Sequence, residues 1–302
     1  MRQLESEGAR LWLARKLHIV WQQSLVKPCR QWGRLGALNF LRFAAWRAIV
    51  ALRLPTPGGR EFSLRAKRCD SRLLARRDSS DVLVFSQVFA EEHYDCIPED
   101  ISPGLIVDCG ANVGYSSAYF LSRFPNAFLV AVEPDPVNCD LLERNLEPYA
   151  NRTQVLRTGI WSESAGLVMS RDTMSSGMEW ARTVRLAEDN EEADVLAIGI
   201  SDILEQTPFD RIAVLKIDIE GAELPLFSRN VDSWLPLTDL ILVELHSQAC
   251  EDAFYNAIAG YPHELVRRGE IVSCRLLTAS DGASRPDAQH THHTERVGLG
   301  DD

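Results

Sequence analysis

From Leu105 onward, short apolar runs alternate with segments of helical periodicity, and this alternation constrains the fold more than any other feature. It is typical of an α/β protein with a doubly wound, mostly parallel sheet and helices on both faces. We predict a Rossmann-like domain over residues 105–280. Its strands are expected at 105–109, 128–133, 153–158, 212–218, 240–246, 264–266 and 271–277, and its helices at 115–124, 136–149, 222–231 and 249–259.

Residues 1–57 predict a basic helical extension. Leu11–Val26 and Leu35–Leu54 carry apolar residues at helical spacing with arginines between them, and the breaker cluster Pro55–Gly59 follows. Residues 1–77 hold 17 basic and 4 acidic residues, whereas the rest of the chain is strongly acidic. Helices packed on the main domain are the simpler interpretation, and peripheral contact with an anionic membrane surface is the alternative. Neither a signal peptide nor a transmembrane helix is predicted, and a cytoplasmic location is expected.

Residues 58–104 form a predicted lead-in to the main domain. Phe62–Arg65 alternates like a short strand, and Ser80 and Asp81 are placed to cap a helix that runs to Tyr94. Because this helix directly precedes the first strand of the sheet, we expect it to act as a lid.

Two further segments depart from the alternation. Ser162–Ser201 is polar, with a short edge strand expected at Val195–Ile200, and an insertion there would lie over the carboxyl edge of the sheet, where ligands bind. Residues 281–302 read as a flexible tail, whose three histidines are not expected to bind a metal. The seven scattered cysteines contain no CxxC pair and favour reduced thiols, with Cys109 in the core.

The loop after the first predicted strand reads Asp108-Cys-Gly110-Ala-Asn112-Val-Gly114-Tyr115. A dinucleotide fingerprint requires GxGxxG, and the middle glycine that admits a pyrophosphate is absent here. An acid beside the loop would repel a pyrophosphate, whereas it suits a cofactor that carries an ammonium and a sulfonium group. The loop therefore favours S-adenosylmethionine over NAD.

Glu133 ends the next predicted strand, about 20 residues after the loop, where a carboxylate can accept hydrogen bonds from both ribose hydroxyls. Pro134-Asp135-Pro136 follows, which stops the strand and starts a helix. We therefore expect Glu133 to face the ligand crevice, although a surface acid at a strand end is the alternative.

Two pairs of polar residues end the later strands. Asp218 and Glu220 follow one apolar run, and Glu244 and His246 follow the next, each pair two residues apart. Continued extended backbone would place both members of a pair on one side, and parallel neighbours would bring all four together. With a pKa near ~6.5, His246 is a candidate general base, oriented by a carboxylate, and Asp218 is the other candidate.

Alternatives for these four residues stay open. Lys216 can pair with a carboxylate, so the acids can instead form a buried ion pair that holds the strand end. Asp218, Glu220, Glu244 and His246 can also bind a hard cation such as Mg²⁺.

These residues resemble the ordered motifs of FkbM-type methyltransferases. The resemblance rests on Asp108–Tyr115, Glu133-Pro134-Asp135, the run Leu215–Glu223 and Val243–His246, and it covers roughly residues 78–250. It implies a class I methyltransferase fold and an S-adenosylmethionine-dependent O-methyltransferase, whose acceptor is a small metabolite, a sugar, or a glycan or lipid hydroxyl. The catalytic residues would be His246, Asp218 and Glu244, and the cofactor site would comprise Asp108, Gly110, Asn112, Gly114, Tyr115, Glu133, Pro134, Trp161 and Asp218. Trp161 departs from the family pattern near the adenine, where it can stack on the base or pack in the core.

Two rival functions remain. One is an NAD-dependent oxidoreductase, and the other is a non-catalytic, methyltransferase-like binding protein. Nucleic acid is not expected as a partner, because the main domain is acidic and the sequence contains no aromatic–basic RNA-binding motif.

Overall fold

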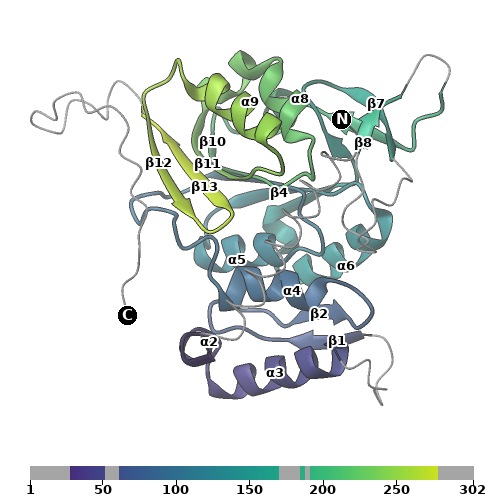
Figure 1. The fold of residues 1–302 in the computed structure, drawn as a ribbon, viewed down its shortest axis with the longest axis vertical. Coiled ribbons are helices and arrows are strands. Elements are labelled where there is room, and N and C mark those ends of the chain that lie inside the picture. The colour runs from purple at the N-terminus through teal and green to yellow at the C-terminus, as the bar shows by residue number, and fades with distance from the viewer. Residues whose placement is uncertain (1–27, 52–60, 170–183, 188–190, 278–302) are drawn as a thin grey trace, which may run out of the picture.

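The computed structural model describes residues 28–51, 61–169, 184–187 and 191–277, and a seven-stranded sheet lies at its centre (Figure 1). All seven predicted strands form, and the expected doubly wound, mostly parallel sheet is confirmed. Five of them are parallel, and β13 runs antiparallel between β11 and β12. In spatial order the strands are β12 (His263–Arg268), β13 (Ile271–Leu276), β11 (Thr238–Glu244), β10 (Ile212–Ile217), β3 (Leu105–Cys109), β4 (Phe128–Val132) and β5 (Thr153–Leu156).

Helices cover both faces of this sheet. Successive strand residues point to opposite faces, so Ile106 packs into one apolar core and Val107 into the other. The first core lies against α5 (Tyr115–Arg123) and α6 (Pro136–Leu146), which η2 (Glu147–Arg152) follows. The second lies against α7 (Ile200–Glu205), α8 (Glu223–Ser228), α9 (Gln248–Ile258) and the short turns η3 (Val231–Ser233) and η4 (Leu235–Leu237). Burial on both faces explains why the strands read as continuous apolar runs.

The lead-in is part of the core. β1 (Glu61–Leu64) pairs with β2 (Leu73–Arg76), and α4 (Asp81–Phe85) continues into a π-helix, η1 (Ser86–Ala90). Ser80 makes no capping bond with its side chain, and Phe85 is fully buried against Tyr115 of α5. The segment is thus packed into the first apolar core, and its action as a lid stays a prediction.

The described part of the N-terminal extension packs on the lead-in. A single helix was expected over Leu35–Leu54, but Gly36, with φ of +81°, separates α2 (Pro28–Leu35) from α3 (Ala37–Ala51). Trp46 of α3 stacks on Phe62 of β1, with ring centroids 3.8 Å apart. The predicted helix Leu11–Val26 and the breaker cluster Pro55–Gly59 lie outside the described residues. Within the described residues, every helix is too short or too polar to cross a bilayer.

The polar insertion builds a second, four-stranded sheet. Its order is β6 (Gly159–Ile160), β9 (Val195–Ile198), β7 (Ala165–Met169) and β8 (Val184–Leu186). β9 pairs on both sides, so the prediction of an edge strand there is wrong. The tail from residue 278 lies outside the described residues. Cys109 is a buried free thiol, as predicted.

Candidate active site

The glycine loop lies directly against the end of β10. Gly110 has φ of +75°, and a Cβ atom there would lie 1.8 Å from the carbonyl oxygen of Asp218. The N–H groups of Gly110 and Ala111 both donate to the carbonyl oxygen of Val132, at 2.9 and 3.0 Å. Gly114, also in the left-handed region, starts α5. Glycine is thus required at position 110 by both conformation and space.

Asp108 lies beneath this loop instead of facing an open crevice. Its side chain is fully buried, one oxygen accepts hydrogen bonds from Ser116 and Ser117 at 2.6 Å each, and the other lies 3.1 Å from Nζ of Lys216. Lys216 also donates to the carbonyl oxygen of Gly110 at 2.6 Å. Burial alone would lower the pKa of Lys216, but the charges of Asp108 and its other neighbours, Asp218 among them, together outweigh burial and raise that pKa above its usual range. The pair therefore anchors the loop from below.

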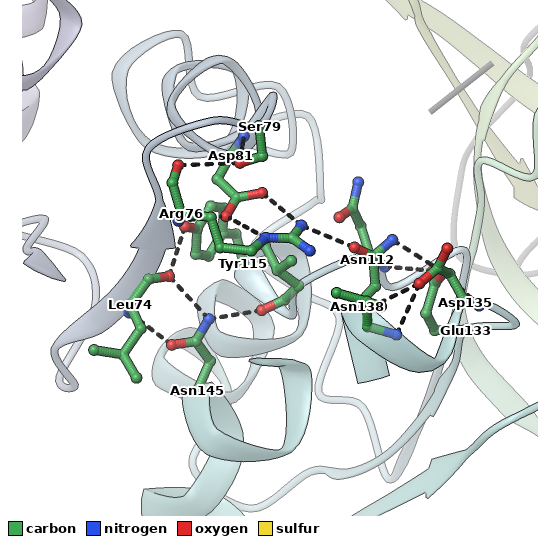
Figure 2. A network of polar contacts seen from close by, with 12 residues as sticks. Leu74, Arg76, Ser79, Asp81, Asn112, Tyr115, Glu133, Asp135, Asn138 and Asn145 are labelled. Carbon is green, nitrogen blue, oxygen red and sulfur yellow. Dashed lines mark hydrogen bonds and ion pairs between the residues drawn. The ribbon is translucent and has the colours of Figure 1, made fainter. Parts of the chain in front are cut away.

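Glu133 meets the loop from the neighbouring strand (Figure 2). One of its oxygens accepts from the backbone N–H of Asn112 at 2.9 Å, and the other accepts from the N–H of Asp135 at 3.0 Å. Asp135 in turn caps α6, as its position before Pro136 suggested. Burial raises the pKa of Glu133, and these hydrogen bonds oppose that rise.

Three residues that the sequence did not identify, Arg76, Asn138 and Asn145, connect the lead-in to Glu133 and the glycine loop. Arg76 binds Asp81 in a two-pronged ion pair and donates to the side-chain oxygen of Asn138 at 2.8 Å, while the amide nitrogen of Asn138 donates to Glu133 at 3.3 Å (Figure 2). Asn145 joins Leu74 of β2 to the glycine loop. A lone arginine and two helical asparagines carry no motif, so only the tertiary structure identifies them.

Several predicted cofactor residues differ in accessibility. Tyr115 is buried, and its hydroxyl donates to the carbonyl oxygen of Leu74 at 2.7 Å, so it packs the core and offers no free group to a ligand. Asn112 and Pro134 are half-buried at the rim of the loop. Trp161 is also half-buried. It directly follows β6 of the small sheet, and its backbone N–H donates to the carbonyl oxygen of Ile198.

The structure brings the four predicted reactive groups together around one imidazole. β10 and β11 are parallel neighbours in register, and Nε2 of His246 lies 3.5 Å from Asp218, 3.5 Å from Glu220 and 3.8 Å from Glu244. The predicted reason is wrong in one respect. Extended backbone does not continue past β10, since Glu220 adopts φ of +53°, and this turn instead directs both carboxylates at His246.

A fifth residue holds the imidazole from behind. Oε1 of Glu223 lies 2.9 Å from Nδ1 of His246, and Glu223 is fully buried. The sequence motif contains Glu223, but its place after the turn gave no reason to assign it a contact with His246.

These carboxylates change the titration of His246. Burial alone would lower its pKa, but the hydrogen bond to Glu223 and the charge of Asp218 outweigh burial and raise the pKa to about 10. The expected value near ~6.5 is therefore wrong. At neutral pH, His246 is an imidazolium, and the side chains of Asp218 and Glu220, each 31% exposed, are the accessible proton acceptors beside it.

Three donor groups of this cluster, on Asp218, Glu220 and His246, lie within 4.8 Å of one another, close enough to share a metal ion. Glu244 lies outside that group. A separate polar cavity of about 680 Å³ opens beside the small sheet and has none of the predicted site residues in its wall. Its lining comprises Ser162, Glu163, Ser164, Ser201, Asp202, Asn230, Asp232 and Ser233.

Comparison with known proteins places this arrangement in a family. Residues 108–268, more than half of the chain, match the methyltransferase FkbM domain. Methyltransferase 1 of Beauveria bassiana is 26% identical over 180 residues, which span 54% of this chain and 72% of that protein. Methyltransferase sdnD of Sordaria araneosa is 28% identical over 190 residues, which span 53% and 73%.

Among solved structures, a methyltransferase FkbM from Methylobacillus flagellatus aligns with a TM-score of 0.41 and 17% identity, over 60% of this chain and 45% of that one. The family match favours a methyltransferase over the alternative of an NAD-dependent oxidoreductase. The chain belongs to the FkbM methyltransferase family.

Proposed function

We propose that the chain transfers a methyl group from S-adenosylmethionine to a hydroxyl group of a small metabolite, a sugar, or a glycan or lipid acceptor. One observation carries the proposal: the glycine loop lies against Asp218, so the cofactor cradle and the carboxylate–imidazole cluster are contiguous. Lys216 spans the two, with Nζ 3.1 Å from Asp108 and 3.7 Å from Asp218. Donor and acceptor would thus meet at one edge of the sheet.

The chain supplies two kinds of group to this reaction. The glycine loop supplies backbone groups and Glu133 supplies one carboxylate, which are the groups that a ribose and an amino acid moiety require. S-adenosylmethionine, when bound, supplies an electrophilic methyl group on its sulfonium. The chain then has to hold the acceptor hydroxyl in line with that methyl group, and this positioning supplies most of the rate enhancement.

Proton removal is assigned to Asp218. As the new C–O bond forms and the C–S bond breaks, the hydroxyl proton must leave, and a half-exposed carboxylate can take it. His246, with its pKa raised to about 10, already carries a proton at neutral pH and stays as the charged partner of Asp218. Asp218 thus replaces His246, the first candidate from the sequence, as the proposed base.

A divalent cation such as Mg²⁺ is the second candidate for this cluster, because Asp218, Glu220 and His246 can offer three ligand atoms. His246 would use Nε2, since Nδ1 contacts Glu223, and a carboxylate behind a ligating imidazole is the usual arrangement in metal sites. In that case the cation, in place of a free carboxylate, would orient and acidify the hydroxyl.

The test is mass spectrometry for one added methyl group across a panel of hydroxylated metabolites, glycans and lipids. With an acceptor in hand, Asp218→Asn should lower turnover by roughly 10²–10⁴-fold. Asp239→Asn is the matched control, since Asp239 pairs with Arg211 at the opposite end of β11. Full activity of Asp218→Asn would exclude Asp218 as the base. Loss of activity with EDTA and its recovery with Mg²⁺ would favour the cation. Cofactor binding without methyl transfer to any acceptor would favour the binding-protein alternative.

A further inference from the structure

An unusual helix forms the outermost layer at one end of the molecule. Figure 1 shows α3 below the β1–β2 hairpin, at the end remote from α8 and α9. Of its 15 residues only Asn39, Arg42 and Arg47 are polar. A helix that is apolar on all sides is normally covered on all sides, in a core or by lipid. In α3, however, the lead-in covers only one side.

The covered and uncovered sides of α3 are distinct. Phe43 is buried on the inner side, where its ring packs on Phe85, and Trp46 stacks on Phe62. The opposite side exposes a stripe at helical spacing, formed by Leu38, Leu41, Ala45 and Ala48.

Two of these side chains are unusually exposed. Leu38 is 61% and Leu41 56% exposed, and Trp32 of α2, which packs on Phe40, adds a third large apolar side chain at 46%. We call Trp32, Leu38, Leu41, Ala45 and Ala48 the α3 face. A contiguous apolar surface of this kind marks a site of association.

The charges around the α3 face select its partner. Residues 28–51 contain four arginines and no acidic residue; Arg34 is paired with Glu92 at 2.7 Å, whereas exposed Arg42 borders the stripe. The preceding residues 1–27 hold five basic and two acidic residues. A second copy of this face, or the chain's own N-terminal segment, would therefore bring like charges together, whereas an anionic surface would attract all of them.

We propose that the α3 face docks on an anionic lipid bilayer as a peripheral, interfacial helix, with the leucines and Trp32 among the acyl chains and Arg42 at the headgroups. Shallow burial of apolar side chains combined with basic residues is how helices lie in a membrane interface. A helix of 15 residues is too short to span the hydrocarbon core, which agrees with docking parallel to the surface. The proposal is independent of the methyl-transfer chemistry.

The test is flotation of the full chain with vesicles of phosphatidylglycerol and phosphatidylcholine, compared with phosphatidylcholine alone. We expect binding to the anionic vesicles that falls with added salt. The double variant Leu38→Glu/Leu41→Glu should bind at least about tenfold more weakly, because it removes apolar contacts and adds repelled charge. The matched control is Leu196→Glu, at a leucine 72% exposed on the small sheet, which should bind like the wild type.

Circular dichroism would check that each variant is folded before flotation. Equal binding of the double variant and the wild type, or no preference of the wild type for anionic vesicles, would overturn the proposal. The proposal would also be overturned if the wild type did not bind vesicles but formed a dimer in light scattering, and the double variant were a monomer. That result would identify a second copy as the partner. Vesicle binding that emerges only after removal of residues 1–27 would also overturn it for the full chain.

Discussion

Nδ1 of His246 lies 2.9 Å from Oε1 of Glu223, a carboxylate that is fully buried. Glu223 also accepts hydrogen bonds from the backbone N–H groups of Ile219 and Gly221, at 3.0 and 2.8 Å. Its position is therefore fixed by the turn that follows β10. The imidazole is held from behind, and Nε2 is left to face Asp218, Glu220 and Glu244.

This contact predicts the titration of His246 in a variant. Glu223→Gln keeps the size of the side chain but removes its charge, so the pKa of His246 should fall from about 10 toward its ordinary value. NMR titration of the imidazole protons would measure it. Glu205→Gln, at an exposed position of α7, is the control and should leave the titration unchanged. An unaltered pKa in Glu223→Gln would show that the other carboxylates determine the charge of His246.

The same raised pKa predicts how stability depends on pH. The folded protein holds the His246 proton more tightly than the unfolded chain, whose histidine pKa is about 6.5. The resulting stabilisation is complete below that value and is lost as pH rises through about 10. Urea unfolding between those two pH values should therefore show a decline in the free energy of unfolding that is smaller in His246→Gln. Parallel declines in the two proteins would assign the effect to other groups.

Gly110→Ala should destabilise the fold. The new Cβ would lie 1.8 Å from the carbonyl oxygen of Asp218 at a residue with φ of +75°, so strain and overlap should together cost about 2–5 kcal/mol. Gly269→Ala is the control, because Gly269 has φ of +63° but no atom within 4 Å of its Cβ position, and it should cost only about 1–2 kcal/mol. Equal losses in urea unfolding would mean that the loop can move away from Asp218.

Arg76→Ala should weaken cofactor binding without altering turnover at saturating cofactor. Arg76 orients Asn138, which donates to Glu133, so its loss should raise the KM for S-adenosylmethionine about three- to tenfold and leave kcat unchanged. Arg157→Ala is the control, since Arg157 binds α6 through Asp140 and Glu143 on the exposed side. A fall in kcat alone would contradict this positioning role.

The centre of the sheet was predictable from the sequence because strands such as β3 and β11 are buried on both faces. Ile106 and Val107 point to opposite cores, so the whole strand must be apolar, and the pattern is unmistakable. Asp218 and His246 lie side by side because β10 and β11 are parallel neighbours, whose carboxyl ends meet at one edge of the sheet. The break between α2 and α3 was not predicted; it lies at Gly36, whose left-handed conformation ends a helix that the apolar spacing alone would continue.

The rest depends on tertiary contacts that leave no local pattern. The strand β2 carries no strong alternation, and its partner β1 lies nine residues upstream across a loop. The raised pKa of His246 needs three carboxylates, those of Asp218, Glu220 and Glu223, and the buried position of Asp108 needs Lys216 from β10. Sequence spacing identified these residues, but their charge states emerged only once their partners were known.

Calorimetric titration of S-adenosylmethionine into the wild type and Glu133→Ala tests the central claim most directly, because it requires no knowledge of the acceptor. Glu133 holds the N–H of Asn112 in the loop and would face the ribose. We predict that the wild type binds the cofactor, that Glu133→Ala binds it at least about tenfold more weakly, and that His246→Ala binds it normally. The absence of binding by the wild type, or equal affinity of Glu133→Ala, would contradict the account.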